Sequence, residues 1–483
     1  MKTHRRHFLK QTSAGMAGWL CCAPYFSSSA IEKAPSSRPN ILFAIADDWS
    51  WPYAGAYGDK AVPTPTFDRV AREGVLFTQA FAAAPQCSPN RASILTGRSI
   101  WQNEEAGTHS SYFPQQLTVY PDILEEAGYS VGFTGKGWGP GNWKDAGRTR
   151  NPAGPEFNRR KLDSLPANGI SNRDYAGNFK DFLATKPKDK PFCFWYGGNE
   201  PHRKYEKGSG LKAGLPIDRI TVPPFLPDDP EIRSDILDYF LEVEWFDRQL
   251  GLIVQALEET GEIENTLFVV TSDNGMPFPG AKANLREYGL HMPLAIRWPK
   301  QIKGGRVIDD IVGFTSFAPT FLEAAGLHVP QAMSGRSFLP LLASNGSGLV
   351  DPGRNQVFAG RERHSHARYD NMGYPSRCLR TPDYLYIRNF KPERWPVGDP
   401  EEFYDVDDGP SKQFMLKNRS QENQKKLFEL AFGIRPSEEL FDIRKDPGCL
   451  VNLAANNEYE KIKNDLKNAL ESVLKEQGDP RQM

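Results

Sequence analysis

Near its start the chain reads Pro39-Asn40-Ile41-Leu42-Phe43-Ala44-Ile45-Ala46-Asp47-Asp48. The apolar part has the length of a β-strand and no alternation of polar and apolar residues, which is typical of a parallel strand buried on both faces. Two adjacent carboxylates at the end of such a strand repel each other unless a cation lies close to them. The stretch therefore predicts a parallel sheet with a cation site at its carboxyl edge.

Segments of strand and helix character alternate from this point to about residue 350. The alternation predicts an α/β fold in which a large, mostly parallel sheet lies between helices. A stretch at 139–172, rich in Gly, Pro, Asn and Arg, is expected to form an ordered loop over a site. The expected strands are Val75–Ala83, Ser130–Thr134, Phe192–Tyr196, Thr266–Thr271 and Pro293–Trp298, and the expected helices are Pro65–Arg72, Pro121–Ala127, Asp235–Thr260 and Ala318–Ala325.

The character of the sequence changes after about residue 350. Short strand candidates follow one another, and an amphipathic helix is expected at Glu458–Lys475. We therefore predict a large domain at 38–350 and a smaller α+β domain at 351–483. The short strands are expected at Val357–Arg361, Cys378–Arg380, Tyr384–Asn389 and Leu440–Ile443.

The charge balance excludes some classes of partner. The 483 residues carry 59 Lys and Arg against 60 Asp and Glu, a net charge of −1. This balance argues against a general electrostatic grip on nucleic acid or on an anionic membrane. No segment after the N-terminal region is long and apolar enough to cross a bilayer, so stable membrane insertion is not expected.

Residues 1–30 have the features of an export signal. Arg5-Arg6 begins a twin-arginine-like pattern, a short apolar stretch follows at 15–23, and Ser28-Ser29-Ala30 is a small-residue cleavage site. A lipid anchor on Cys21 or Cys22 is the alternative. We expect an exported protein, periplasmic or secreted.

The most specific segment is Cys87-Ser88-Pro89-Asn90-Arg91-Ala92-Ser93-Ile94-Leu95-Thr96-Gly97. Helical character over Ser88–Leu95 places Cys87 at a helix N-terminus, where backbone N–H groups favour negative charge. Arg91 lies one turn further on the same face. A buried structural thiol is the alternative. A tyrosine-phosphatase loop is excluded, because Ser93 stands where that loop requires arginine.

This segment matches the signature C-x-P-x-R-x-x-x-x-T-G and thereby resembles the type I sulfatase family. The run from Glu439 to Ile443 and the later Asp446-Pro447 and Asn452-Leu453-Ala454 are similar to that family's C-terminal pattern. The resemblance implies an alkaline-phosphatase-like fold, with a catalytic domain at 38–350 and a C-terminal part that completes the substrate pocket. It also implies that Cys87 is converted to formylglycine, whose hydrate supplies the nucleophile.

The resemblance assigns a metal site as well. Asp47-Asp48 matches the family's first metal pair, and Asp273-Asn274 in Ser272-Asp273-Asn274-Gly275 matches its second. With the modified Cys87, these residues form the expected ligand set. Taken alone, Asp273-Asn274-Gly275 would be read as a turn after a strand. Oxygen donors of this kind suit Ca²⁺ better than zinc.

Four further residues match catalytic positions of the family. Arg91 belongs to the signature, Lys136 falls beside the formylglycine, His202 lies near the leaving oxygen, and Lys282 matches a basic residue on the sulfate. One departure is clear: family members usually have a histidine two or three residues after the lysine, and here the chain reads Gly137-Trp138-Gly139. Because that histidine is expected to help break down the sulfated hydrate, its absence implies slower release of the product, a substitute base from elsewhere in the chain, or loss of activity.

The C-terminal part holds a group of basic residues that we expect to contact substrate. A cluster of this kind suits a second anionic group on a sugar, which arginine can bind bidentately. Several motifs, among them Tyr374-Pro375-Ser376-Arg377, are similar to the heparan N-sulfatase (sulfamidase) branch. The predicted substrate-binding residues are His109, His364, His366, Arg368 and Arg377.

The sequence thus predicts an exported sulfatase that hydrolyses an O-sulfate or N-sulfate of a sulfated polysaccharide or its oligosaccharides. A formylglycine-generating enzyme is an implied partner. Two alternatives stay open: a non-catalytic protein that binds sulfated glycans, and a phosphatase or phosphodiesterase on the same fold. The latter usually has Ser or Thr as nucleophile and two zinc ions, which this sequence does not match.

Overall fold

The computed structural model describes residues 38–364 and 366–482, all within one compact unit. The expected export signal at 1–30 lies outside these residues. Among the described helices, none combines the length and the apolar character that a membrane crossing requires.

A seven-stranded sheet forms the centre of the molecule, in the order β4-β5-β1-β6-β7-β2-β8. Its strands are mostly parallel, but β7 runs antiparallel to both neighbours. The expected fold class is therefore confirmed. The strands are β1 (Asn40–Ala46), β2 (Val75–Phe77), β4 (Ser130–Gly135), β5 (Phe192–Gly197), β6 (Thr266–Ser272), β7 (Leu294–Arg297) and β8 (Arg306–Ile308).

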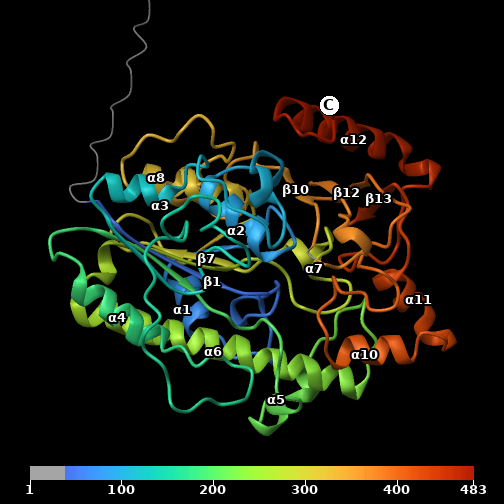
Figure 1. Ribbon diagram of the computed structural model, residues 1–483, viewed down its shortest axis with the longest axis horizontal. Helices are drawn as coiled ribbons and strands as arrows, with labels where there is room; N and C mark the ends of the chain where they lie inside the picture. The colour runs from blue at the N-terminus through green and yellow to red at the C-terminus, as the bar shows by residue number, and fades with distance from the viewer. Residues whose placement is uncertain (1–37, 365, 483) are drawn as a thin grey trace, which may run out of the picture. The chain divides into compact units, whose positions relative to one another are not determined.

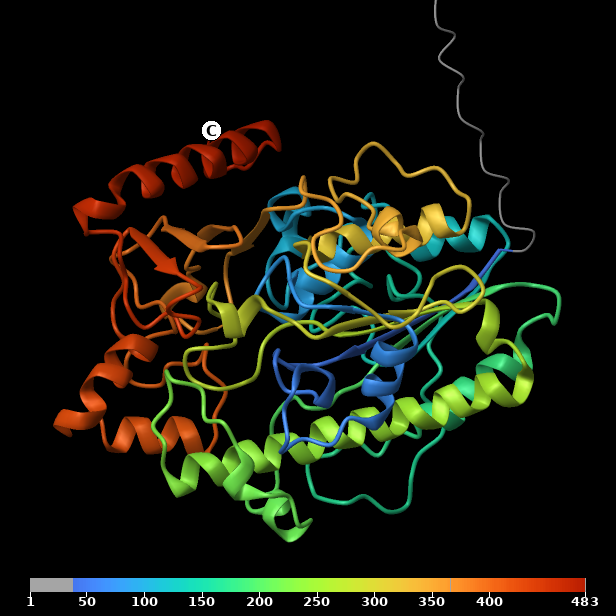
Figure 2. The same cartoon turned by 180° about the vertical axis from the view of Figure 1, so that it is seen from behind.

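Helices cover both faces of this sheet (Figures 1 and 2). Alternate residues of β1 enter two different apolar clusters: Phe43 packs in one with Phe321 of α8, and Leu42 belongs to the other with Phe240 of α6. Every residue of β1 is buried, which explains the continuous apolar run in the sequence. One face carries α2 (Cys87–Thr96), α3 (Tyr120–Glu126) and α8 (Phe317–Ala324), and the other carries α1 (Pro65–Glu73), α4 (Tyr175–Thr185) and α6 (Pro230–Thr260).

Two expected elements differ from the structure. The strand predicted at Val75–Ala83 is broken after Phe77, because β3 (Ala80–Phe81) leaves the main sheet to pair with β9 (Val312–Gly313). The helix predicted from Asp235 begins five residues earlier at Pro230. There the Asp229 side chain accepts a hydrogen bond from the Glu231 N–H at 2.9 Å, and proline occupies the first turn.

A second sheet of four antiparallel strands lies in the C-terminal part, in the order β10-β11-β12-β13. Leu470 and Leu474 of α12 pack against its Leu379, Tyr386 and Leu440. This is the expected smaller α+β region, while its boundary at residue 350 stays a prediction. The remaining elements are β10 (Val357–Arg361), β11 (Ser376–Arg380), β12 (Tyr384–Asn389), β13 (Glu438–Asp442), α5 (Ser209–Lys212), α7 (Glu287–Leu290), α9 (Leu339–Ala343), α10 (Pro410–Lys417), α11 (Glu422–Phe432) and α12 (Glu460–Glu476).

Candidate active site

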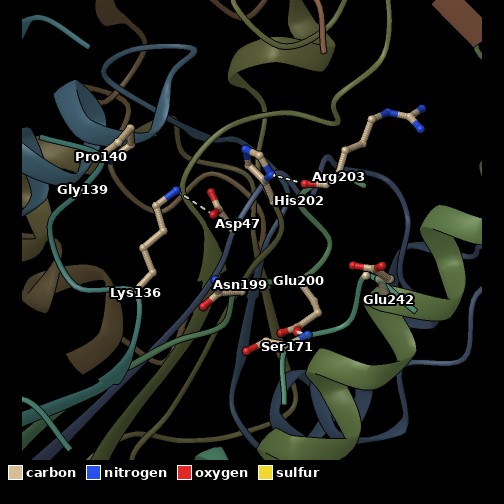
Figure 3. A pocket seen from close by; sticks show the side chains of 11 residues that line it. Asp47, Lys136, Gly139, Pro140, Ser171, Asn199, Glu200, His202, Arg203 and Glu242 are labelled. Atoms are coloured by element: carbon tan, nitrogen blue, oxygen red, sulfur yellow. Dashed lines mark hydrogen bonds and ion pairs between the residues drawn. The ribbon is translucent and has the colours of Figure 1, made fainter. Parts of the chain in front are cut away.

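Polar side chains gather where four neighbouring strands of the main sheet end. Asp47 and Asp48 follow β1, Asp273 follows β6, Lys136 follows β4, and His202 comes shortly after β5. Because β4, β5, β1 and β6 are adjacent and parallel, their carboxyl ends meet at one edge of the sheet. Residues far apart in the sequence therefore share one site, and Figure 3 shows Asp47, Lys136 and His202 around it.

The acidic residues of the site converge on one point. Side-chain ligand atoms of Asp47, Asp48, Asp273 and Cys87 all lie within 4.8 Å of one another. The Asp48 N–H donates a hydrogen bond to Asp273 Oδ1 at 3.1 Å, and the φ of Asp48 is 77°. This left-handed conformation is uncommon for a residue other than glycine and is often found at functional sites.

Asn274 adds an oxygen to this cluster. Its Nδ2 donates to Asp48 Oδ1 at 2.6 Å, while its Oδ1 is buried and has no hydrogen-bond partner among the described residues. A buried acceptor without a partner costs about 1–3 kcal/mol, and a cation would satisfy it. The donor set of three carboxylates and one amide oxygen therefore fits a hard divalent cation.

Burial and fixed charges give two of these acids different pKa values. Burial works to raise the pKa of Asp47, yet Lys136, His202, Arg91 and Lys282 together hold it well below its ordinary value. Burial raises the pKa of Asp273 to about 6, against the lowering effect of Arg91. A cation at this point would favour the ionised form of both carboxylates.

Cys87 is the first residue of α2, as the sequence predicts. Gly97 ends this helix with a φ of 66°, and its N–H donates to Ser93 O at 2.9 Å. The Cys87 thiol lies 3.3 Å from Asp47 Oδ1 and is 1% exposed. Burial, together with the charge of Asp47, raises the pKa of this thiol well above its ordinary value. The unmodified thiol is therefore a weak nucleophile despite its position.

Arg91 connects the helix to the acidic cluster. Its Nε donates to Asp273 Oδ2 at 2.7 Å, and its Nη1 donates to the carbonyl oxygens of Lys136 and Gly137 at 2.8 and 3.0 Å. The side chain is fully buried. Arg91 thus fixes the position of Asp273, a candidate metal ligand, and of the segment that contains Lys136.

The other predicted catalytic residues are also in this site. Lys136 Nζ lies 2.6 Å from Asp47 Oδ2, and Lys282 Nζ lies 2.7 Å from Asp48 Oδ2. His202 Nε2 is 3.9 Å from Asp48 Oδ2, and its Nδ1 lies 2.6 Å from the carbonyl oxygen of Arg203. Because a carbonyl only accepts, Nδ1 carries the hydrogen, which leaves Nε2 to exchange a proton with a ligand.

Asp407 is a member of the site that the sequence did not indicate. Its Oδ2 lies 2.9 Å from Lys282 Nζ, so Lys282 sits between Asp48 and Asp407. The acidic run Asp405-Val406-Asp407-Asp408 within a basic region was the available signal. Among the described residues, the site thus brings together four carboxylates (Asp47, Asp48, Asp273, Asp407) and three fixed cations (Arg91, Lys136, Lys282).

Trp138 lies in the segment where the resemblance to the family leads us to expect a histidine. Its indole Nε1 donates to Ser88 O on α2 at 3.0 Å, and its ring packs edge-on against Phe113 with 5.0 Å between the centroids. The side chain is 3% exposed. Trp138 therefore anchors the segment after Lys136 to α2 and supplies no titratable group.

The structure corrects the expectation that the basic cluster grips an anion. Arg361, Arg368 and His364 all bind one buried carboxylate, Asp405, with His364 Nδ1 at 2.6 Å from Asp405 Oδ1. Arg368 also donates to the carbonyl oxygens of Trp395 and Pro396. These side chains neutralise an internal acid, so Arg368 is not a substrate contact.

Arg377 needs the same correction. It is 0% exposed, its Nε lies 2.6 Å from Asp479 Oδ2, and its Nη2 lies 2.6 Å from Glu362 Oε1. Its guanidinium also lies over the ring of Trp101 at 5.2 Å from the centroid. With these contacts Arg377 has no surface left for a sugar, and its role is structural.

The two remaining predicted substrate residues lie near this cluster. The rings of His109 and His364 are 4.0 Å apart between centroids. Burial lowers the pKa of His109 well below its ordinary value, and the charges of His364, Lys282 and Lys136 act in the same direction. His366 is exposed and has a φ of 56°. For both residues, contact with substrate stays a prediction.

Comparison with known proteins identifies the family. The family model described as Sulfatase matches residues 39–327, which is more than half of the chain. The chain belongs to the sulfatase family. A second model, described as N-sulphoglucosamine sulphohydrolase, C-terminal, matches residues 281–431 of this sulfatase.

Relatives of this sulfatase agree with the assignment. An ulvan-active sulfatase of Formosa agariphila is 31% identical, over 94% of this chain and 84% of that protein. Human N-sulphoglucosamine sulphohydrolase is 28% identical, over 95% of this chain and 94% of that protein. The expected enzyme class, a sulfuric ester hydrolase, is therefore confirmed.

A solved structure in complex with its substrate D-glucosamine-2-N,6-O-disulfate superimposes with a TM-score of 0.65 and 21% identity. The match covers 92% of this chain and 99% of that one. It supports the sulfatase fold that the sequence predicts.

Proposed function

We propose that this sulfatase removes sulfate groups from a sulfated polysaccharide or its oligosaccharides, with a formylglycine made from Cys87 and with Ca²⁺ as its metal. The observation that carries the proposal is the position of Cys87. Its sulfur lies 3.3 Å from Asp47 and among the side chains that fit a divalent cation. An unmodified thiol with a raised pKa is poorly suited to attack at this point.

The two absent groups would supply defined chemistry. A hydrated formylglycine offers a hydroxyl as the nucleophile toward sulfur, and a bound Ca²⁺ offers charge stabilisation to sulfate oxygens. Asp47, Asp48, Asp273 and the side-chain oxygen of Asn274 would hold the cation, because all of them are hard oxygen donors.

The residues of this chain then have separate roles. Lys136 and Lys282 place fixed positive charge beside the cluster, where they can balance charge on the sulfate. His202 has its side chain 36% exposed and its Nε2 free of the bond to Arg203, so in its doubly protonated form it can deliver the Nε2 proton to the leaving oxygen or nitrogen. Arg91 is buried and bonded to Asp273 and to the Lys136 segment, which makes it a positioning residue.

The class of substrate follows from the relatives. By their names, three relatives act on ulvan, on N-sulphoglucosamine and on N-acetylglucosamine 6-O-sulfate, so we propose a sulfated sugar substrate for this chain as well. The model of the N-sulphoglucosamine sulphohydrolase C-terminus matches residues 281–431, which supports placing the chain near the sulfamidase branch. A test of activity should therefore include both N-sulfated and O-sulfated sugars.

Replacement of Cys87 tests the proposed function. Cys87→Ala removes the atom that modification would convert, so turnover of sulfated oligosaccharides should fall to background while the thermal unfolding midpoint stays close to that of the wild type. Mass spectrometry of the wild-type peptide that holds residue 87 should show an aldehyde in place of the thiol. An unmodified thiol in active enzyme, or turnover by Cys87→Ala above a tenth of the wild-type rate, contradicts the proposal.

We also propose that the protein is exported in a folded, modified state. The twin-arginine-like Arg5-Arg6 motif supports this, because that route carries folded proteins, whereas modification must reach Cys87 before folding buries it. Replacing Arg5-Arg6 by Lys-Lys should leave active, aldehyde-bearing enzyme in the cytoplasm. Normal export of the variant would refute the signal, and a cytoplasmic variant with an unmodified thiol would refute the order of events.

A further inference from the structure

A cavity of about 580 Å³ opens beside the proposed catalytic residues. This volume lies within the range of about 300–1,000 Å³ that small-molecule sites span. Asp47, Lys136 and His202 form one part of its wall (Figure 3). The ends of the predicted ordered loop at 139–172 contribute Gly139, Pro140, Gly169 and Ser171, and further lining residues are Asn199, Glu200, Arg203 and Glu242.

Glu242 is the unexplained group in this wall. It projects from α6, is 2% exposed, and its Oε2 has no hydrogen-bond partner among the described residues. In Figure 3 its carboxyl group lies on the side of the cavity away from Lys136. A buried polar atom without a partner is costly in an apolar setting, so a partner supplied by a ligand would stabilise it.

The surroundings of Glu242 are already fixed. Glu200 accepts hydrogen bonds from the Ser171 N–H at 2.7 Å and from the Tyr175 hydroxyl at 2.9 Å. Gly169 has a φ of 101°, and a Cβ there would lie 2.1 Å from Lys204 O, so glycine is required for the loop to pass this close. Glu242 therefore faces a rigid wall and can gain its partner from the cavity.

The chemistry of this wall favours a neutral, hydroxyl-bearing ligand. The carboxyl, amide and hydroxyl side chains of Glu242, Asn199 and Ser171 are among the lining residues. The guanidinium of Arg203 is bound to both oxygens of Asp235, at 2.8 and 2.7 Å, and its Nε donates to Pro277 O. No uncommitted cation among the described lining residues stands near Glu242, so a second sulfate would find no counter-charge there.

The raised pKa values of Glu200 and Glu242 agree with a neutral, hydroxyl-bearing ligand. Burial raises the pKa of Glu200 to about 7, and burial with the charge of Glu200 raises the pKa of Glu242 well above its ordinary value. A carboxylic acid held neutral both donates and accepts a hydrogen bond. Sugar hydroxyl groups have the same double capacity.

We propose that Glu242 is a specificity-determining residue that hydrogen-bonds neutral hydroxyl groups of the sugar bound in this cavity. This rests on the proposed function, since it places the sugar in the cavity beside Lys136 and His202. The basic cluster around Asp405 then has no direct part in binding, and selectivity comes from the wall that Glu242 shares with Glu200.

Substitution of Glu242 tests the subsite. The probes are glucosamine 2-N-sulfate, N-acetylglucosamine 6-sulfate and sulfated ulvan oligosaccharides, each compared with 4-nitrophenyl sulfate, which has no sugar. For the sugar that the wild type cleaves fastest, Glu242→Ala should raise KM at least tenfold relative to the aryl ester. Glu242→Gln should stay within about threefold of the wild type, because the amide has a donor group and an acceptor group in the same places.

Glu244 provides a matched control on the same helix. It is half-buried, lies two residues along α6, and is not among the residues that line the cavity. Glu244→Ala should leave kcat/KM within twofold for the sugar and for the aryl ester. Thermal unfolding of each variant confirms that the fold is kept.

Calorimetric titration tests the Glu242 subsite separately from the proposed sulfatase function. The same sugars are added to the Cys87→Ala protein with and without Glu242→Ala, so that binding is measured without turnover. A loss of affinity of at least tenfold in the double variant supports the subsite, and equal affinities overturn it. Failure of the wild type to hydrolyse any of the sulfated sugars contradicts the proposed function instead.

Discussion

Lys282 is held between two carboxylates that come from opposite parts of the chain, Asp48 after β1 and Asp407 before α10. Asp407→Asn removes one of the two charges, so Lys282 should be drawn toward Asp48 and away from a bound sulfate. We expect kcat for a sulfated sugar to fall about tenfold, which corresponds to ~1.4 kcal/mol, with a smaller change in KM. Steady-state kinetics measures both.

The neighbouring residue gives the control for this prediction. Asp408 is exposed, and its Oδ1 accepts a hydrogen bond from Gln413 Nε2 at 2.6 Å. Asp408→Asn should leave kcat within twofold of the wild type, because surface charges of this kind contribute little. If kcat falls equally in the two variants, Asp407 acts only through the total charge of the acidic run at 405–408.

These residues show which part of the site the sequence could predict. Asp47, Lys136 and Asp273 follow strands, so their meeting at one edge follows from the parallel sheet. Asp407 lies in a loop whose position depends on tertiary packing. The internal pairing of Arg377 could not be predicted, because its partner Asp479 is distant in sequence and a basic cluster looks the same in the sequence whether it is solvated or paired internally.

At the scale of the elements, α6 supports α1 through one buried carboxylate. Asp247 accepts hydrogen bonds from the N–H groups of Thr66 and Phe67 at 2.8 and 2.7 Å, in the first turn of α1. These N–H groups have no partner within their own helix. Burial raises the pKa of Asp247 to about 7, although the same hydrogen bonds oppose the rise.

This raised pKa makes the contribution of the contact between α6 and α1 to the free energy of unfolding depend on pH. The folded state holds the proton more tightly than the unfolded chain, so the stabilisation is complete below the ordinary aspartate pKa and is lost as pH rises through about 7. Asp247→Asn cannot titrate. The stability of the wild type relative to the variant should therefore fall between pH 5 and pH 8, by at most about 3 kcal/mol. Urea unfolding at both pH values measures it, and a parallel response of the two proteins contradicts it.

Elements with a clear apolar pattern were predictable, and those fixed by distant pairing were not. Every residue of β1 is buried, and its sequence shows this directly. The break between β2 and β3 depends on a partner strand, β9, more than two hundred residues later in the chain. The helices α10 and α11 have partly exposed faces, and neither is among the helices that we expected from the sequence.

At the scale of the whole molecule, the candidate metal site joins the ends of β1 and β6 at the centre of the main sheet. Asp47 and Asp48 follow β1, Asp273 and Asn274 follow β6, and Cys87 brings α2 against them. Because the site is formed by segments that are distant in the sequence, the unfolded chain cannot offer it. A cation that binds it should therefore stabilise the fold as a unit.

Removal of the metal should lower the thermal unfolding midpoint as well as activity. At a Ca²⁺ concentration about one hundred times Kd the gain is ~2.7 kcal/mol, which for a chain of this length corresponds to about 3 °C. Chelation should abolish that gain, and Ca²⁺ should restore it better than Zn²⁺, because the ligands are oxygen atoms. Asn274→Ala removes the buried oxygen that has no other described partner, so its midpoint should respond far less to added Ca²⁺. A stronger response to Zn²⁺ than to Ca²⁺ in the wild type would instead favour a phosphatase-like metal centre.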